Sequence, residues 1–215
     1  MNQLHHWLCR SAAWKRTLEL RVPWVLSSAE LGRHLLEVGP GPGFTTDRLR
    51  SAVARLTTIE ADQELAQSLR ARLWGTNVEV VNGDATTMSF QDAEFSGCAA
   101  FTMLHHVPSP ALQDKLLREV WRVLKPGGAF VGCDSRQGLV MRVLHLADTF
   151  VPIRPETFGA RLEDAGFKVI ELEKGPSAFR FYALKPNAQC LNGIGFAPYC
   201  SLNKSKGHTP GGIAE

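Results

Sequence analysis

Long apolar runs are absent from the 215-residue sequence, and none approaches the ~18 residues that a membrane-spanning helix needs. Residues 1–16 also lack the uninterrupted apolar stretch of a secretion signal. A strong charge bias is missing too, because 24 basic and 21 acidic residues leave a formal net charge of +3. A balance this close does not favour nucleic acid as a bulk partner. These absences predict a protein without a membrane span and without a nucleic-acid partner.

Cysteines are few, and none has the CxxC spacing of a zinc ribbon or a redox pair. They are odd in number and scattered along the chain: Cys9, Cys98, Cys133, Cys190 and Cys200. Such usage is typical of free thiols in a reducing compartment rather than of a disulfide framework. The sequence therefore predicts a cytoplasmic protein with no metal site.

The length fits one domain with short extensions at its ends. Residues 186–215 contain five glycines and three prolines, show no hydrophobic period, and have only three charged side chains. Composition of this kind is typical of a segment that does not join a packed core. We therefore predict an N-terminal segment over 1–33, a folded domain over 34–185 and a disordered tail over 186–215.

Strand-like and helix-like segments alternate through the central part of the chain. Short apolar or β-branched runs predict strands over 34–38, 56–60, 78–81, 98–103 and 129–133. Helical spacing predicts helices over 44–54, 63–73, 110–124, 138–149 and 155–165, with Asp62 and Ser109 as N-terminal caps and a helix-ending turn at 125–128. Two last strands, 168–172 and 178–184, follow each other without a helix and suggest an antiparallel edge hairpin. This order is typical of an α/β fold with a doubly wound, Rossmann-like sheet.

A glycine-rich turn, Gly39-Pro40-Gly41-Pro42-Gly43, joins the first strand to the first helix. Glycines there place bare backbone beside a ligand at the carboxyl end of the sheet. Dinucleotide enzymes prefer G-x-G-x-x-G, whereas the sixth position here is Phe44, and no Gly-Lys-Ser/Thr of a P-loop follows. The spacing therefore favours a nucleoside ligand other than a dinucleotide.

Acidic residues stand at the ends of the next two strands. Glu60 can accept hydrogen bonds from ribose hydroxyls, and Asp84 can accept an exocyclic adenine amine while Ala85 offers its backbone N–H. Each acid also has a simpler interpretation: Glu60 is then a solvated strand-end acid, and Asp84 stabilises its own Asx turn. Asp62 competes with Glu60, but its place before Gln63 favours a helix cap.

Five blocks in this order resemble the class I S-adenosylmethionine-dependent methyltransferases, in the small subgroup described as methyltransferase-11-like. They are LLEVGPGPG (35–43), TTIEAD (57–62), NGDATTMSF (82–90), FTMLHHVPSP (101–110) and REVWRVLKPGG (118–128). The resemblance implies a seven-stranded sheet of order 3-2-1-4-5-7-6 whose last strand is antiparallel. It also implies methyl transfer with S-adenosyl-L-methionine as cofactor.

The same resemblance assigns residues to the cofactor. It places the glycine loop beneath the methionine moiety and ribose, one acid on the ribose, one on the adenine, and backbone carbonyls near the sulfonium. These cofactor-binding residues are Glu37 (bracing the loop), Gly39, Gly41, Gly43, Glu60, Asp84, Ala85, Phe101 and Thr102.

Methyl transfer is an in-line displacement, and alignment alone supplies much of its acceleration. A general base is needed only when the acceptor carries a proton at the reacting atom. His105 and His106 follow the fourth strand, where an acceptor approaches, and are the candidate catalytic residues; packing or capping is the alternative role for either.

The segment before the first strand is rich in aromatic residues. His6, Trp7 and Trp14 are candidates for a helical lid that lines the substrate pocket, although Trp7 and Trp14 also fit ordinary packing on one helix face. The loops typical of enzymes that methylate DNA, ribosomal adenine or arginine are missing, so a small-molecule acceptor remains by exclusion. A non-catalytic module that binds the cofactor and a nicotinamide-dependent oxidoreductase are the alternatives.

Overall fold

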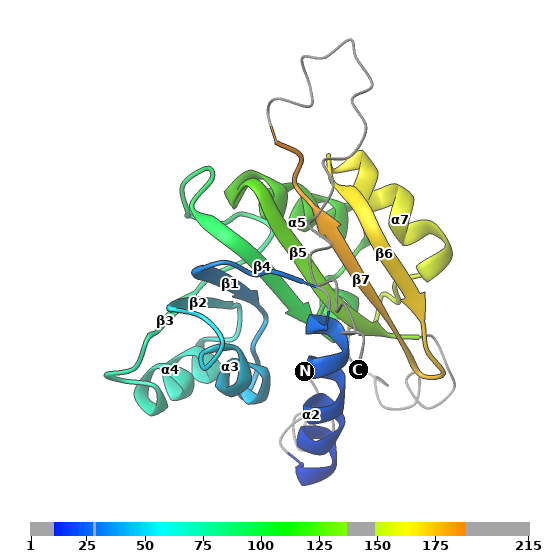
Figure 1. The fold of residues 1–215 in the computed structure, drawn as a ribbon. Coiled ribbons are helices and arrows are strands. Elements are labelled where there is room, and N and C mark those ends of the chain that lie inside the picture. Colours follow the sequence, from blue (N-terminus) through cyan, green and yellow to red (C-terminus); the bar gives the residue numbers. More distant parts are fainter. Residues whose placement is uncertain (1–10, 28, 137–148, 188–215) are drawn as a thin grey trace, which may run out of the picture.

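The computed structural model describes residues 11–27, 29–136 and 149–187. Seven strands form one sheet in the order β3-β2-β1-β4-β5-β7-β6, with helices on both faces (Figure 1). The strands are β1 (His34–Val38), β2 (Arg55–Glu60), β3 (Val78–Asn82), β4 (Phe95–Phe101), β5 (Leu124–Ser135), β6 (Lys168–Lys174) and β7 (Ala178–Leu184). Strand β7 pairs antiparallel with both β5 and β6, whereas the pairs among β1 to β5 are parallel. The predicted fold class, strand order and edge hairpin are confirmed.

The two faces of the sheet are built by the alternation of side chains along each strand. Leu36 and Val38 of β1 join the core cluster that includes residues of helices α5 (Pro110–Val123) and α7 (Pro155–Asp164). Leu35, which directly precedes Leu36 in β1, belongs to the opposite cluster, which holds residues of α2 (Ala12–Leu26) and α3 (Phe44–Leu49). Because apolar residues face both ways, the central strands are covered on both sides.

Two predicted helix starts are confirmed by their caps. Asp62 accepts hydrogen bonds from the backbone of Glu64 and Leu65 at the start of α4 (Gln63–Arg72). Ser109 caps α5 in the same way, and Pro110 occupies its first turn, where a missing N–H leaves no hydrogen bond unmade.

Several predicted boundaries were wrong. Helix α3 ends at Leu49 rather than at residue 54, because residues 51–54 turn towards the next strand. Strand β4 spans 95–101 rather than 98–103, since Thr102 leaves the extended conformation at φ 51°. Strand β5 begins at Leu124, and the register shift between Phe95 and Gly97 accommodates the Pro-Gly-Gly sequence that we expected to be only a turn. The helix predicted over 138–149 lies almost wholly outside the described residues.

Candidate functional site

A pocket of about 410 Å³ opens at the carboxyl ends of β1, β2 and β4. Parallel strands gather their following loops at one edge of the sheet, so residues distant in sequence meet there. Residues of the glycine loop, the ends of β2 and β4, the turn after β3, and helices α2, α3 and α5 line it. Those used below are Trp14, Leu18, Gly39, Gly41, Phe44, Glu60, Asp84, Ala85, Phe101, Thr102, His105, His106, Leu112 and Leu116.

The glycine loop contributes backbone rather than side chains to this pocket. Gly39, Gly41 and Gly43 all have positive φ values, a conformation that favours glycine. A Cβ on Gly41 would have no atom within 4 Å, so this glycine borders open space. Gly43 is different: it does not line the pocket, and a Cβ there would collide with Arg72 and Leu69 of α4. Its glycine is explained by helix packing.

Glu37 is almost completely buried beneath the glycine loop and does not line the pocket. Thr45 and Thr46, at the start of α3, donate their hydroxyls to its two carboxylate oxygens. Burial raises the pKa of Glu37 to about 7, and these two hydrogen bonds oppose the rise. The side chain thus holds the glycine loop against α3, as expected for a residue that braces the loop.

Glu60 lies at the end of β2 with its carboxylate turned to the glycine loop. Its Oε2 accepts a hydrogen bond from the Gly41 backbone N–H at 2.9 Å, and its Oε1 accepts one from Asp62 N–H at 3.0 Å. Burial raises its pKa, opposed by those backbone donors. Glu60 lines the pocket, whereas Asp62 is exposed and is engaged as a helix cap.

Asp84 and Ala85 line the pocket from the turn after β3. The Asp84 carboxylate accepts hydrogen bonds from the backbone N–H of Thr86 at 2.8 Å and from its hydroxyl at 2.9 Å. This is the Asx turn that we considered as the simpler interpretation. The turn and the pocket position coexist, because the turn holds the carboxylate at the rim of the pocket.

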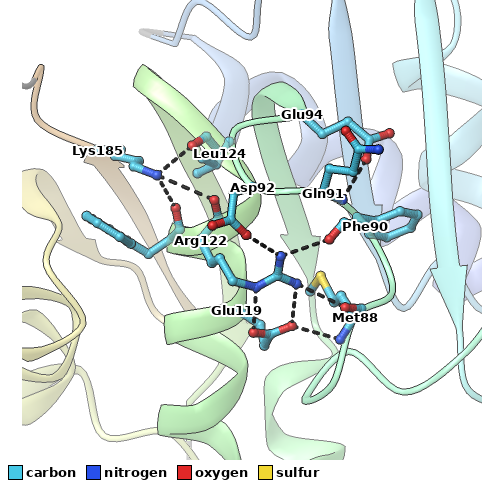
Figure 2. Close-up of polar contacts among 10 residues, drawn as sticks. Met88, Phe90, Gln91, Asp92, Glu94, Glu119, Arg122, Leu124 and Lys185 are labelled. Atoms are coloured by element: carbon cyan, nitrogen blue, oxygen red, sulfur yellow. Dashed lines mark hydrogen bonds and ion pairs between the residues drawn. The ribbon is translucent and has the colours of Figure 1, made fainter.

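The turn after β3 is fastened to α5 by an arginine that the sequence interpretation missed (Figure 2). Arg122 donates to the backbone carbonyls of Met88 and Phe90 and pairs with Glu119 and Asp92. Glu119 in turn accepts the Met88 backbone N–H at 2.8 Å. These contacts fix the chain just beyond the pocket-lining residues 83–86.

Phe101 and Thr102 line the pocket where β4 ends. The Thr102 N–H donates to the Cys133 carbonyl of β5 at 2.8 Å, which continues the strand pairing into the turn. At this point the backbone reverses, and the short helix η1 (Leu104–His106) begins.

His105 is paired with a buried aspartate. Its Nδ1 lies 2.5 Å from Asp134 Oδ1, and its backbone N–H donates to Asp134 Oδ2 at 3.2 Å. Both side chains are nearly inaccessible to bulk water, yet His105 lines the pocket. His106 also lines the pocket, and the centres of the two imidazole rings are 4.1 Å apart. The sequence interpretation named both histidines and missed Asp134.

The predicted substrate-pocket residues are only partly described. Trp14 lines the pocket from the first turn of α2, together with Leu18 one turn later. His6 and Trp7 lie outside the described residues. Among the described residues, no helix is long and apolar enough to cross a membrane. The same residues contain no group of three or more His, Cys, Asp or Glu that could hold a metal ion.

The chemistry of this pocket suits a nucleoside ligand. Open space over Gly41 accepts a group that must approach the backbone closely, and Glu60 and Asp84 offer carboxylates from adjacent strand ends. Phe44, which stands at the sixth position of the motif where dinucleotide enzymes have a glycine, lines the pocket.

Comparison with known proteins agrees with this geometry. The family described as "Methyltransferase domain" matches residues 36–132. Over 191 residues the chain is 26% identical to a ubiquinone biosynthesis O-methyltransferase from Aromatoleum aromaticum, covering 78% of this chain and 80% of that protein. A shorter match, 41% identical over 56 residues, covers 26% of this chain and 21% of a probable ribosomal RNA small subunit methyltransferase A from Pyrococcus abyssi.

Among solved structures, the PH0226 protein from Pyrococcus horikoshii superposes with a TM-score of 0.70 at 19% identity. The superposition covers 82% of this chain and 93% of that one, and it shows a shared fold. Residues 36–132 therefore match the methyltransferase-domain family, and the relatives and solved structures support a class I S-adenosylmethionine-dependent methyltransferase with S-adenosyl-L-methionine as its cofactor. Several curated relatives are longer proteins, and the match spans less than half of their length.

Proposed function

We propose that the chain transfers the methyl group of S-adenosylmethionine to a small-molecule acceptor. The observation that carries this proposal is the pocket itself. One cavity of about 410 Å³ combines the bare glycine loop, two strand-end carboxylates and a buried histidine–aspartate pair. That volume is in the range of small-ligand sites, ~300–1,000 Å³, and α2 covers part of it with Trp14.

Each of the pocket residues would bind a different part of the cofactor, as the family resemblance implies. Gly39 and Gly41 would lie beneath the methionine moiety and ribose, Glu60 would accept the ribose hydroxyls, and the pair Asp84 and Ala85 would bind the adenine. Backbone carbonyls at Phe101 and Thr102 would stabilise the positive sulfur. The cofactor supplies a methyl group already activated by a sulfonium leaving group, so the protein mainly has to align the acceptor with it.

Two observations favour a small acceptor over a nucleic acid: how much of this chain each relative covers, and the apolar residues that line the pocket. The quinone-biosynthesis relative covers 78% of this chain, whereas the ribosomal RNA relative covers 26%. Trp14, Leu112 and Leu116 make part of the pocket apolar. An apolar, partly covered cavity suits an organic molecule better than a phosphate backbone.

His105 would act as the general base if the acceptor carries a proton at the reacting atom. Because Asp134 holds Nδ1, the proton resides there and Nε2 is the basic atom of the ring. His105 would accept the proton of an acceptor hydroxyl at Nε2. His106, which also lines the pocket, is the second candidate for this step.

Calorimetry and an acceptor screen test the proposal. We expect micromolar binding of S-adenosylmethionine and no binding of NADH, and we expect transfer of labelled methyl to at least one small acceptor. Binding without transfer to any acceptor would favour a non-catalytic module, and NADH binding would favour an oxidoreductase.

Variants of the histidine–aspartate pair then test the base. With the best acceptor from the screen, His105→Ala should lower kcat by ~10²-fold, the low end expected for losing a general base. Asp134→Asn should lower kcat and change its pH profile while cofactor affinity stays the same. A larger loss in His106→Ala than in His105→Ala would transfer the role to His106.

We propose that residues 1–33 form a lid segment, of which α2 is the described part, that 34–185 form the catalytic domain, and that 186–215 form a tail outside it. The two described cysteines, Cys98 and Cys133, are buried free thiols, which is compatible with a cytoplasmic location.

A further inference from the structure

Arg21, on α2, carries a positive charge that no described carboxylate neutralises. The residue is half-buried, and its Nη1 is shielded from water without a hydrogen-bond partner. Three other arginines of the described chain, Arg72, Arg161 and Arg180, each pair with a carboxylate within 2.8 Å.

Arg21 lies beside the pocket and is not one of the residues that line it. It follows Leu18 by one helical turn and Trp14 by two, and both of those residues line the cavity. The Arg21 guanidinium lies 5.6 Å from the centre of the Trp14 ring, so the side chain runs back along α2 towards the pocket.

Arg21 also lies near the ends of β4 and β5, where the acceptor should approach. The next residue, Val22, packs in the same cluster as Phe101 and Cys133. Burial raises the pKa of Cys133 to about 12, and the positive charge of Arg21 is the largest influence that lowers it. Cys133 directly precedes Asp134, the partner of His105.

A shielded guanidinium without a counterion is unfavourable, because its lost hydration is not replaced. The face of Trp14 offsets only part of this, since a cation–π contact is weaker than the lost hydration of a guanidinium. An incoming anion would complete the site. A single guanidinium fork matches one carboxylate in charge and in geometry, whereas a phosphate dianion usually meets more than one cation.

We propose that Arg21 binds a carboxylate of the methyl acceptor, so that the acceptor is a small carboxylic acid held between Arg21 and His105. This inference rests on the proposed function and narrows its substrate class. The cofactor has a carboxylate of its own, and the experiment must therefore separate the two sources of the same chemistry.

Binding of benzoate to the full chain saturated with S-adenosylhomocysteine provides that separation. Benzoate suits the apolar lining formed by Trp14, Leu112 and Leu116. We expect Arg21→Met to weaken benzoate binding by at least ~10-fold, which corresponds to ~1.4 kcal/mol, and Arg21→Lys to weaken it less. Arg16→Met, an exposed position on the same helix with the same loss of charge, is the matched control and should bind benzoate as the wild type does.

The affinity for S-adenosylhomocysteine, measured on the same variants, should stay within about twofold of the wild-type value. Failure of benzoate to bind the wild-type protein, or equal binding by Arg21→Met, would overturn the inference. A loss of S-adenosylhomocysteine affinity in Arg21→Met would overturn it too, because Arg21 would then serve the cofactor.

A second measurement uses methyl transfer. With labelled cofactor, carboxylic acids should be better acceptors than their methyl esters, and Arg21→Met should reduce this preference by at least ~10-fold. Equal transfer to acids and esters would reject the inference while leaving the proposed function intact. Absence of cofactor binding, by contrast, would reject the proposed function itself.

Discussion

Glu60 and Asp84 show how one carboxylate serves both the fold and a ligand. Each lines the pocket, and each already accepts two hydrogen bonds. Glu60 accepts them from Gly41 of the glycine loop and from Asp62, and Asp84 accepts them from Thr86 of its own turn. A carboxylate can accept about four hydrogen bonds, so capacity for a ligand remains after these contacts. The local bonds hold each acid in place before the ligand arrives.

Removing either acid should weaken the binding of S-adenosylmethionine. We expect Glu60→Ala and Asp84→Ala each to lose ~1–3 kcal/mol of binding free energy, because charge-assisted hydrogen bonds disappear. Calorimetric titration measures this loss, and Glu79→Ala, on the exposed edge strand β3, is the control.

Asp84→Asn separates the two roles of that residue. Asparagine keeps an oxygen for the Asx turn to Thr86 but loses the charge. Affinity between those of the wild type and Asp84→Ala is expected. Unchanged affinity in both Asp84 variants would reduce Asp84 to a turn residue and contradict the site assignment.

At the scale of elements, helix α5 supports the side of the pocket that is formed by the turn after β3. Arg122 makes its contacts to a loop that has no regular backbone pairing of its own between residues 83 and 94, so a side chain must supply the missing hydrogen bonds (Figure 2). Helix α2, on the other face, is fastened at its carboxyl end by Arg180, which donates to Trp24 O and pairs with Glu171 and Glu173. Both walls are thus anchored by arginines from other elements.

Arg122→Met should lower the free energy of unfolding by about 2–3 kcal/mol. The substitution removes the Arg122 donor from the carbonyls of Met88 and Phe90, and it leaves the carboxylate of Glu119 with the Met88 backbone N–H but without its ion pair. Urea unfolding measures the change. Arg118→Met, an exposed position on α5, should change stability by less than ~0.5 kcal/mol, and an equal effect of the two substitutions would contradict the anchoring role.

At the scale of the whole molecule, local signals predicted the elements and the family resemblance predicted their order. The caps at Asp62 and Ser109 were predictable because they depend on residues three positions away. The pairing of His105 with Asp134 spans 29 residues and exists only because β4 and β5 are neighbours. An acid at the end of the predicted fifth strand, beside the loop of His105, was the available signal. The burial of Arg21 Nη1 depends on how α2 packs on the sheet, and no local sequence pattern specifies this packing.

The stability of the whole molecule should depend on the proton of Glu37. Burial raises its pKa to about 7 in the folded state, against the ordinary value of 4.5 that the side chain has in an unfolded chain. Between these values the folded state keeps a proton that the unfolded state has released, so the free energy of unfolding must fall as pH rises from about 4.5 to about 7. The contribution is on the order of 3 kcal/mol and levels off above pH 7.

Glu37→Gln isolates this effect, because glutamine stays neutral at every pH. Relative to the wild type, the variant should gain stability as pH rises from 4.5 to 7, measured by urea unfolding at several pH values. Glu64→Gln, an exposed position on α4, is the control and should run parallel to the wild type. The pKa of Glu60 is also raised, but Glu60 is present in all three proteins, so its effect cancels when their free energies of unfolding are subtracted. A constant difference between Glu37→Gln and the wild type across this range would show that Glu37 is charged in the folded protein, and the threonine hydroxyls would then outweigh its burial.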